Sequence, residues 1–542
     1  MYRPKNKQVP KLSDTVVISN EYKERVRAAS YLGKKGYTIP KSVLTKEDDE
    51  FLHKDLFLKP IIFGANYGGK NAEESTAFPV FRENAQKIYI PRFYGIQRYG
   101  LPNKCEIQDG NDISVEFPKQ LRDYQTEIID KYVKYVSVPI CTGGSNPGSG
   151  GILEVPCGRG KTVMALKIIS LLKKKTLIIV HKEFLMNQWI ERINEFLPGA
   201  TVGKIQGPTF DVDDKDIVIG MIQTLYDKEY PADTFSCFGL TIIDEVHRIG
   251  SEQFSRTLFK TITPYMLGIS ATVDRKDQLT RVLYMYIGEK IYSENKKGDD
   301  AVNVRAINYI TNDTEFNEVE CDFRGNPKYS TMITKLCAFG PRSDFIIRVI
   351  NDLITEEPGN QIMVLCHNRS LLTYLFEGLN YRNIGTVGYY VGGMKQKDLQ
   401  VTESKQIVLA TYAMAAEALD IKTLSSLIMV TPKTDITQSV GRILRVKHAN
   451  PIIVDIVDKH DIFKNQWTQR KRFYKKCNYN IVEIDSVKYA GMEVDWKNDK
   501  TWTRVYVPKI LDNGQCANED PDDEVSKKPQ GKCLINFGDL QL

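Results

Sequence analysis

The chain has 542 residues, of which 42% are hydrophobic and 26% charged, and its formal net charge is +6. This length predicts about three or four globular domains, and the mild positive charge permits a polyanionic partner without requiring one. The sequence contains no run of eighteen or more apolar residues, which excludes a transmembrane helix of the usual kind. The first residues lack the apolar stretch of a signal peptide, so we expect an intracellular protein with no membrane partner.

The ten cysteines are scattered and form no Cys-x-x-Cys pair. Several lie inside apolar runs such as 363–366, where a thiol packs as a small hydrophobic group. We therefore interpret them as reduced, mostly structural thiols, and we expect neither a disulfide framework nor a zinc site.

Residues 1–115 are mixed in composition and rich in turn-forming Pro and Gly, which predicts a small accessory domain of α/β or β-rich type. Within it, 87–94 has the aromatic and β-branched alternation of a strand. Basic and aromatic side chains gather around the end of this run, namely Arg92, Phe93, Tyr94, Arg98 and Tyr99. They would either stack on bases and contact phosphates or form the core of the small domain.

A predicted helix opens at Leu121 and runs towards Tyr135, with Gln125 near its start. A glutamine amide carries a donor and an acceptor together, as needed to read the edge of adenine. The Gly- and Ser-rich segment 142–151 that follows is typical of a flexible connector.

The connector leads into a glycine loop between a short apolar strand and an apolar helix. Gly158 and Gly160 allow successive backbone N–H groups to point at an anion, and the helix adds its positive dipole end. Lys161 would contact the β- and γ-phosphates of a nucleotide, and the Thr162 hydroxyl would hold Mg²⁺. Val155 stands where the general pattern has a further glycine, so an ordinary strand-to-helix turn is the alternative here.

Beyond the loop, apolar strand-like runs alternate with amphipathic helices, for example 176–180 before 183–196. This alternation predicts βαβ units and a parallel sheet with functional loops at the carboxyl ends of its strands. One such strand ends at Asp244 and Glu245. Asp244 would hold Mg²⁺ through water and Glu245 would deprotonate the attacking water, unless the pair only favours a helix start. A further strand closes at 270–272 with hydroxyl groups suited to sensing the nucleotide.

Together these segments resemble the motor of the superfamily 2 helicases. The segments that carry the resemblance follow the family's order and are Gln125, 158–162, Asp244-Glu245-Val246-His247, Ser270-Ala271-Thr272, 362–368, Ala410-Thr411 with 417–420, and 438–445. The resemblance implies an α/β fold of two RecA-like parallel-sheet domains in tandem, with an N-terminal accessory domain and a short C-terminal extension. The domains that it implies are 1–115, 116–292, 293–465 and 466–542, the last with a flexible acidic segment.

The resemblance also implies roles for residues of the second half. Arg442 and Arg445 lie three apart on one predicted helical face and would act as arginine fingers, with Gln438 as a further catalytic residue. The alternative for the two arginines is a solvated basic helix face. Thr411 would contact the nucleic-acid backbone. The nucleotide-binding residues that the resemblance implies are Arg122, Gln125, Gly158, Arg159, Gly160, Lys161, Thr162 and Asp420.

Finer features resemble two branches of the family. Trp189 and the triplet after Ser-Ala-Thr look like the duplex-DNA translocases of the XPB type, in which an Arg-Glu-Asp element would contact DNA. Here the element begins at Arg275, and Lys276 reverses one charge, which leaves its strand-separating role open. The segments 36–40 and 78–83 resemble helicases of large nucleocytoplasmic DNA viruses, such as the poxvirus late-transcription helicase.

We therefore expect an ATP-dependent helicase or translocase that uses ATP and Mg²⁺ and acts on nucleic acid, with DNA favoured and RNA still open. Transcription or repair is the expected setting, with the transcription machinery as a partner. The viral resemblance implies action at the site of replication in the host cell and is compatible with packaging in the virion. The alternative class is a nucleic-acid clamp or assembly subunit, in which ATP sets affinity without strand separation.

After about residue 460 the sequence departs from the shared motor. The run 463–476 predicts a basic, aromatic helix, which would be a solvated helix packed by its aromatics or, less favoured, a phosphate-tracking surface. The segment 518–528 is acidic and then basic with almost no apolar residues, and it is predicted to be a disordered loop or tail.

Overall fold

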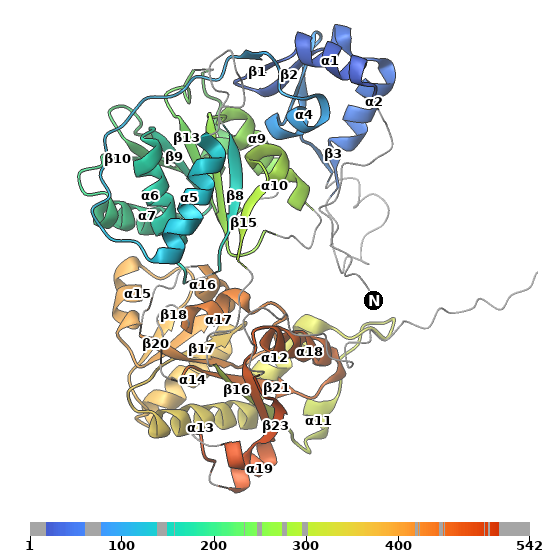
Figure 1. Ribbon diagram of the computed structural model, residues 1–542. Coiled ribbons are helices and arrows are strands. Elements are labelled where there is room, and N and C mark those ends of the chain that lie inside the picture. Colours follow the sequence, from blue (N-terminus) through green and yellow to red (C-terminus); the bar gives the residue numbers. More distant parts are fainter. Residues whose placement is uncertain are drawn as a thin grey trace, which may run out of the picture.

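The computed structural model shows two α/β lobes and a smaller domain at the side of the first lobe (Figure 1). The residues that it describes are 18–59, 77–137, 149–156, 158–231, 233–246, 252–273, 279–294, 302–417, 421, 423–443, 448, 450–492, 494–496 and 499–508. The acidic segment expected at 518–528 lies outside these residues.

The accessory domain is built on a five-stranded sheet of order β5-β6-β2-β1-β7, with a separate pair β3-β4. Its elements are α1 (Asn20–Ala29), β1 (Tyr31–Gly33), β2 (Gly36–Pro40), η1 (Lys41–Val43), α2 (Lys46–Asp55), β3 (Phe57–Leu58), β4 (Phe78–Pro79), β5 (Arg82–Glu83), β6 (Lys87–Ile90), α4 (Arg92–Tyr99) and β7 (Lys104–Cys105). The strand predicted over 87–94 ends at Ile90, because Pro91 has no N–H for the ladder and α4 begins directly after it. The strand prediction is wrong for residues 92–94.

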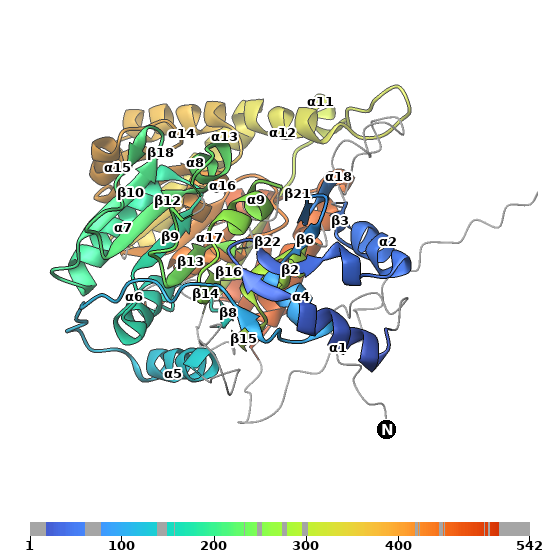
Figure 2. The same ribbon diagram turned by 90° about the horizontal axis from the view of Figure 1, so that it is seen from above.

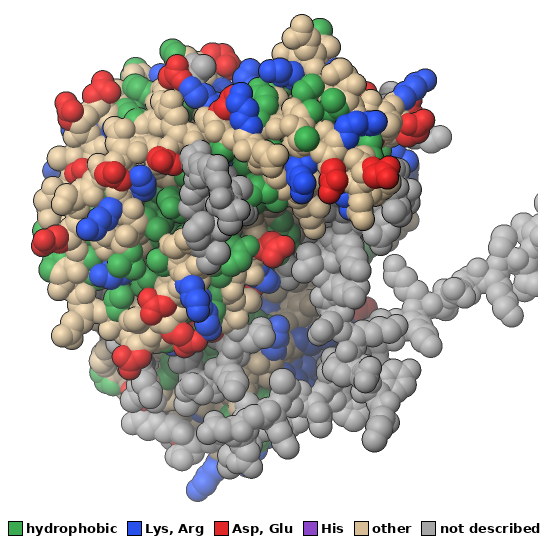
Figure 3. Space-filling model, turned by 45° about the horizontal axis from the view of Figure 1, so that its top comes forward, with side chains coloured by type: hydrophobic (Ala, Val, Ile, Leu, Met, Phe, Trp, Pro, Cys, Tyr) green, Lys and Arg blue, Asp and Glu red, His purple; other side chains and the backbone are tan. Residues whose placement is uncertain are grey.

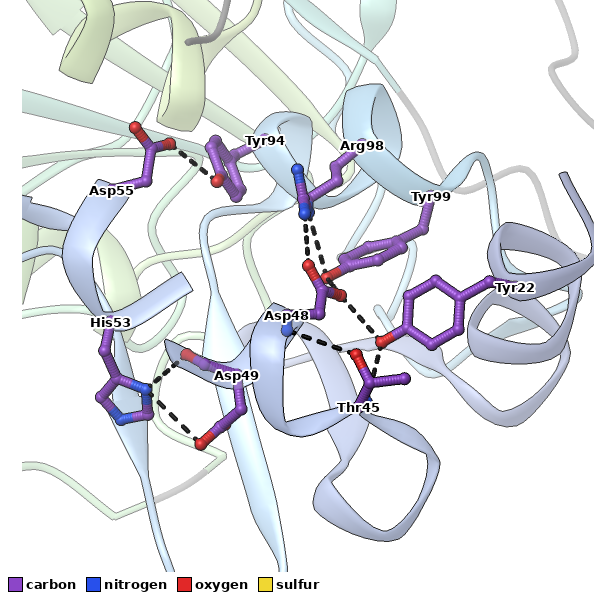
Figure 4. Close-up of polar contacts among 9 residues, drawn as sticks. All are labelled: Tyr22, Thr45, Asp48, Asp49, His53, Asp55, Tyr94, Arg98 and Tyr99. Atoms are coloured by element: carbon purple, nitrogen blue, oxygen red, sulfur yellow. Dashed lines mark hydrogen bonds and ion pairs between the residues drawn. The ribbon is translucent and has the colours of Figure 1, made fainter. Parts of the chain in front are cut away.

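The basic and aromatic residues of α4 contribute to the core of the accessory domain. Arg98 makes a buried ion pair with Asp48 of α2, and Tyr99 donates a hydrogen bond of 2.6 Å to the same carboxylate. Tyr22 of α1 also donates to it, at 2.9 Å, and Figure 4 shows these side chains converging on Asp48. A buried charge must be paired and hydrogen-bonded, so this cluster ties α1, α2 and α4 together. Of the two interpretations of these residues, the structure supports the core.

The first RecA-like domain contains an eight-stranded sheet of order β11-β10-β12-β9-β13-β14-β8-β15. Its elements are α5 (Asp123–Ser137), β8 (Gly150–Glu154), α6 (Lys161–Leu172), β9 (Thr176–Val180), α7 (Glu183–Phe196), β10 (Val202–Gln206), β11 (Thr209–Phe210), β12 (Ile217–Met221), α8 (Ile222–Asp227), β13 (Leu240–Asp244), α9 (Glu252–Lys260), β14 (Tyr265–Ser270), α10 (Thr280–Ile287) and β15 (Lys290–Ser293). Its strands pair in parallel except at β11, which is antiparallel to β10. The apolar strands thus form the parallel sheet that the βαβ alternation predicts.

Helices cover both faces of this sheet, because successive residues of each strand point to opposite sides. Ile178 packs in a core with α5, α6 and α7, whereas Ile179 packs in a core with α8, α9 and α10. The accessory domain shares the second core, and Figure 2 shows it on the side away from α5, α6 and α7. Buried Arg92 fixes this contact, since its guanidinium donates to the carbonyl oxygens of Thr263 and Pro264 at 3.0 Å each.

The second RecA-like domain contains an eight-stranded sheet of order β18-β19-β17-β20-β21-β16-β22-β23, parallel except between β22 and β23. Its elements are β16 (Asn303–Tyr309), α11 (Thr314–Asn317), α12 (Tyr329–Ala338), α13 (Gly340–Glu356), β17 (Gln361–Cys366), α14 (Arg369–Tyr381), β18 (Val387–Tyr390), α15 (Gln396–Glu403), β19 (Ile407–Thr411), α16 (Tyr412–Glu417), β20 (Leu424–Met429), α17 (Thr437–Ile443), β21 (Ile452–Asp458), α18 (Asp461–Lys476), β22 (Asn480–Asp485), α19 (Ser486–Gly491), η3 (Asp499–Thr501) and β23 (Thr503–Tyr506).

The second sheet extends past the boundary expected at residue 465. That boundary falls inside α18, and β22 and β23 then continue the sheet beyond β16. On α18, buried Arg470 pairs with Asp455 of β21 at 2.7 Å, and Tyr474 donates to the same carboxylate at 3.0 Å. The chain as far as Tyr506 therefore belongs to the second domain, and the expected extension from 466 onward is corrected accordingly.

Acidic and basic side chains are intermixed on the face shown in Figure 3, over the first domain and the accessory domain. This mixture follows from the near balance of 74 Lys and Arg against 68 Asp and Glu in the sequence. Every helix in the described ranges is too short or too polar to span a lipid bilayer.

Candidate functional site

The glycine loop lies between the carboxyl end of β8 and the first residue of α6. Gly158 and Gly160 have φ values of 84° and 81°, in the left-handed region that glycine enters without strain. A Cβ at position 160 would lie 2.4 Å from Nε2 of Gln125, so any other residue there would displace the end of that side chain. Lys161 and Thr162 then open α6, whose free N–H groups and dipole favour an anion at this end.

The start of α5 is hydrogen-bonded to the glycine loop. Nε2 of Gln125 donates to the carbonyl oxygen of Arg159 at 3.0 Å, and Oε1 of Gln125 accepts from the backbone N–H of Arg122 at 3.1 Å. Tyr124 donates to the same carbonyl at 3.3 Å, and the Arg159 guanidinium lies 4.4 Å from its ring centroid. Three of the predicted nucleotide-binding residues thus lie together: Arg122, Gln125 and Arg159.

The two acidic residues lie at the carboxyl end of β13, between β9 and β14 in the sheet. Nζ of Lys161 lies 3.2 Å from Oε1 of Glu245, so the glycine loop and the acidic pair meet at one sheet edge. Glu245 has a φ of 50°, an uncommon conformation for a residue with a side chain.

Asp244 is buried and accepts a hydrogen bond from Nε1 of Trp189 on α7, at 2.9 Å. Burial, and after it the charge of Glu245, raises the pKa of Asp244 to about 6, while Lys161 acts in the opposite direction. Nothing in the local sequence pattern points from α7 to Asp244, so a role of Trp189 at this site could not be predicted from the sequence.

Glu154, the last residue of β8, is a further site residue that the sequence analysis missed. One of its carboxylate oxygens accepts from the backbone N–H of Val273 at 2.8 Å. The other accepts from Nζ of Lys290 at 2.9 Å and from the hydroxyl of Ser293 at 2.6 Å. Glu154 thus joins the strand before the glycine loop to β15 and to the segment that follows Ser-Ala-Thr. The sequence feature that could have pointed to Glu154 is a charged residue at the end of an apolar strand.

Two other hydrogen bonds lie at or near the glycine loop. Nε of Arg159 donates to Glu294 at 2.9 Å, so the loop is also linked to the residue that follows β15. The hydroxyl of Ser270, at the carboxyl end of β14, donates to the carbonyl oxygen of Thr272 at 2.6 Å and fixes the turn after that strand. Both contacts stiffen the edge of the sheet that carries Lys161 and Asp244.

In the second domain, half-buried Thr411 ends β19 at the carboxyl edge of the sheet. Gln438 and Arg442 lie four positions apart on α17, where residues share a helix face, but their side chains are not described. The predicted residues Arg275, Asp420 and Arg445 lie outside the described residues, as does His247. Within the described part of the chain, no group of three or more His, Cys, Asp and Glu has the arrangement of a metal site.

Residues 118–275 match the protein family described as the res subunit of type III restriction enzymes. A mimivirus protein named as an ATP-dependent RNA helicase is 34% identical over 525 residues, covering 94% of this chain and 97% of the relative. An African swine fever virus protein with the same kind of name is 28% identical and covers 69% of this chain and 75% of that protein.

An archaeal relative matches a shorter part of the chain. The DNA 3'-5' translocase XPB2 of Sulfurisphaera tokodaii is 31% identical over 214 residues, which is 38% of this chain and 44% of that protein. The mimivirus match, in contrast, extends over nearly the whole of both chains. The chain therefore belongs to the ATP-dependent superfamily 2 helicases of large nucleocytoplasmic DNA viruses.

Proposed function

We propose that this helicase translocates on DNA in viral transcription or repair, driven by ATP hydrolysis between its two RecA-like domains. The observation that carries the proposal is the contact of Lys161 with Glu245, 3.2 Å apart, next to buried Asp244. A phosphate-binding lysine and a carboxylate base meet there at the carboxyl ends of parallel strands, which is where such sheets bind their ligands.

The residues of the first domain have separate tasks in this proposal. The backbone N–H groups of the glycine loop and of α6 hold the phosphates, and Lys161 adds its charge at the β- and γ-phosphates. As Lys161 turns to the phosphates, it releases the carboxylate of Glu245, which orients the attacking water and accepts its proton. Gln125 and Arg122 lie at the start of α5. One N–H of the Gln125 amide donates to Arg159 and its oxygen accepts from Arg122, so the second N–H and the second lone pair would read the adenine edge.

Asp244 and Thr162 would hold Mg²⁺, Asp244 through water. Both offer the oxygen ligands that this ion prefers, and the buried carboxylate of Asp244 has a raised pKa that a nearby cation would lower. When bound, Mg²⁺ neutralises charge on the phosphates.

The second domain would complete the site. Arg442 and Arg445 act as arginine fingers on the γ-phosphate, Gln438 acts beside them, and Asp420 lies next to the nucleotide. Closure of the two domains then depends on ATP, and their separation after hydrolysis becomes movement along the strand.

DNA as the substrate is supported by the archaeal relative, whose name describes a DNA 3'-5' translocase. Thr411 and Arg275 would contact the nucleic-acid backbone, which predicts binding that weakens with salt and depends little on base sequence. RNA is the second candidate, because the mimivirus and African swine fever virus relatives are named as RNA helicases. We further propose that the protein works with the transcription machinery at the viral replication site in the host cell.

The test is ATP hydrolysis by the purified full chain, without polymer and then with duplex DNA, single-stranded DNA or RNA, each beside Glu245→Gln. Stimulation by DNA above RNA supports the proposal, and stimulation by RNA alone replaces DNA with RNA. Glu245→Gln should bind ATP and hydrolyse it at least about 10²-fold more slowly, since it removes the general base. Absence of hydrolysis with every polymer would favour the ATP-controlled clamp.

A further inference from the structure

Trp189 lies in the apolar stripe with which α7 packs on the sheet. The buried residues of this helix are Leu185, Met186, Trp189 and Ile193, at the spacing that places them on one face. The indole ring of Trp189 is 1% exposed, and its Nε1 meets Oδ2 of Asp244 at 2.9 Å. The helix therefore presents one polar atom inside an otherwise apolar face, and that atom faces a carboxylate that the proposed function uses.

The chemistry of an indole suits this position. The N–H of indole can only donate, so it requires the facing oxygen of Asp244 to remain an acceptor. The indole is also neutral, so it fixes the carboxylate and leaves the negative charge in place. A lysine or arginine partner would neutralise that charge. Because Asp244 is only 7% exposed, a rotated carboxylate would lose this hydrogen bond in a site that water reaches poorly.

We propose that Trp189 is a positioning residue for the proposed magnesium site. It holds Oδ2 of Asp244 in place, and because the carboxylate is planar, fixing one oxygen also restricts the direction of the other. The proposal rests on the proposed function insofar as Asp244 is taken as the residue that holds Mg²⁺. Hydrogen-bond partners that orient the groups around a metal ion are a general feature of metal sites.

The test compares Trp189→Phe with a matched control, Trp502→Phe, in the full chain. Both tryptophans are buried, and Trp502 donates from Nε1 to the backbone oxygen of Asp495 at 3.1 Å, in the second domain. Calorimetry measures ADP binding with EDTA and then across a Mg²⁺ titration. We expect Trp189→Phe to leave ADP binding in EDTA unchanged and to raise the Mg²⁺ concentration needed at half effect by about 10-fold or more. Trp502→Phe should change neither value.

Two results would overturn the proposal: an unchanged Mg²⁺ requirement in Trp189→Phe, or an equal loss of ADP binding with and without Mg²⁺, which marks a packing role only. If Trp189→Phe does not fold, a benzothienylalanine at position 189 keeps the ring volume and removes only the N–H, and the same titration decides. The readout is binding, so it remains valid for a chain that hydrolyses no ATP. Failure of the proposed function would instead appear as absence of Mg²⁺-linked ADP binding in the unmodified protein.

Discussion

At the level of single residues, the charges of the candidate site are partly balanced by contacts within the chain. Lys161 neutralises Glu245 across 3.2 Å, and neutral Trp189 holds Asp244. Burial, and after it the charge of Glu245, raises the pKa of Asp244, whereas Lys161 and the hydrogen bond from Trp189 act in the opposite direction. These contacts explain why two adjacent carboxylates can lie at one strand end.

The raised pKa of Asp244 predicts that acid weakens Mg²⁺ binding. A proton and Mg²⁺ compete for the same carboxylate, and protonation becomes dominant as the pH falls through the pKa of about 6. We expect the Mg²⁺ concentration needed for ADP binding to be nearly constant above pH 7 and to rise by up to about 10-fold per unit below pH 6. Calorimetry between pH 5.5 and 8 measures this, and a requirement that does not change over that range contradicts the prediction.

Gly160→Ala should reduce nucleotide affinity, because the new Cβ would lie 2.4 Å from Nε2 of Gln125 and the backbone has a φ of 81°. Gly199→Ala is the matched control, since Gly199 also has a positive φ, of 96°, but nothing within 4 Å of an added Cβ. Both substitutions should cost about 1 kcal/mol of unfolding free energy from backbone strain. Only Gly160→Ala should weaken ADP binding in EDTA, and equal affinities for the two variants would show that the close contact is irrelevant.

At the scale of helices and strands, buried ion pairs anchor helices to their sheets. On α18, Arg470 pairs with Asp455 of β21 and also donates to the carbonyl oxygen of Lys433 at 2.7 Å. In the accessory domain, Arg98 plays the same part with Asp48. In each case the sequence shows a basic helix residue among aromatics. The structure shows that this residue is buried and that its charge pairs with an aspartate inside the domain.

Arg470→Ala should destabilise the second domain strongly, since it leaves Asp455 buried without its partner. The expected loss of unfolding free energy is about 3–5 kcal/mol. Arg472→Ala, which removes an exposed arginine of the same helix, should change stability by less than about 0.5 kcal/mol. Urea unfolding followed by fluorescence measures both, and similar midpoints for the two variants would mean that the pair does not hold α18.

At the scale of the whole molecule, the accessory domain and the first RecA-like domain share one hydrophobic core. The cores of the second domain contain residues of that domain alone. Arg92 with its two carbonyl partners, and Arg281 with Asp55 at 3.0 Å, add polar contacts to the shared boundary. The accessory domain is therefore a fixed part of the first lobe.

This sharing predicts two thermal transitions in calorimetry, one for residues 18–294 and one for residues 302–508. Arg92→Met should lower only the first transition, because it leaves the carbonyl oxygens of Thr263 and Pro264 without their buried donor. A chain that begins at residue 116 should lose the same transition and aggregate, since it exposes the apolar residues under the accessory domain. A separate third transition in the full chain would show that the accessory domain unfolds independently.

Local sequence patterns were enough to predict the fold class and the parallel sheet, and they singled out the glycine loop and the acidic pair as candidates. These follow from local patterns: apolar runs with a period of two or 3.6, and polar residues at the ends of strands. Two expectations were nevertheless wrong. The strand predicted over 87–94 ends before Pro91. The second domain, expected to end at 465, also includes β22 and β23 in its sheet.

The partners of the charged side chains, in contrast, became apparent only from the folded chain. Trp189 and Asp244 are 55 residues apart, and Arg98 and Asp48 are 50 apart. A local pattern shows that a residue is polar, but its burial and its partner depend on segments that fold against it from elsewhere in the chain. The same reason placed Glu154 between β15 and the turn after β14, where the sequence had shown only the end of an apolar strand.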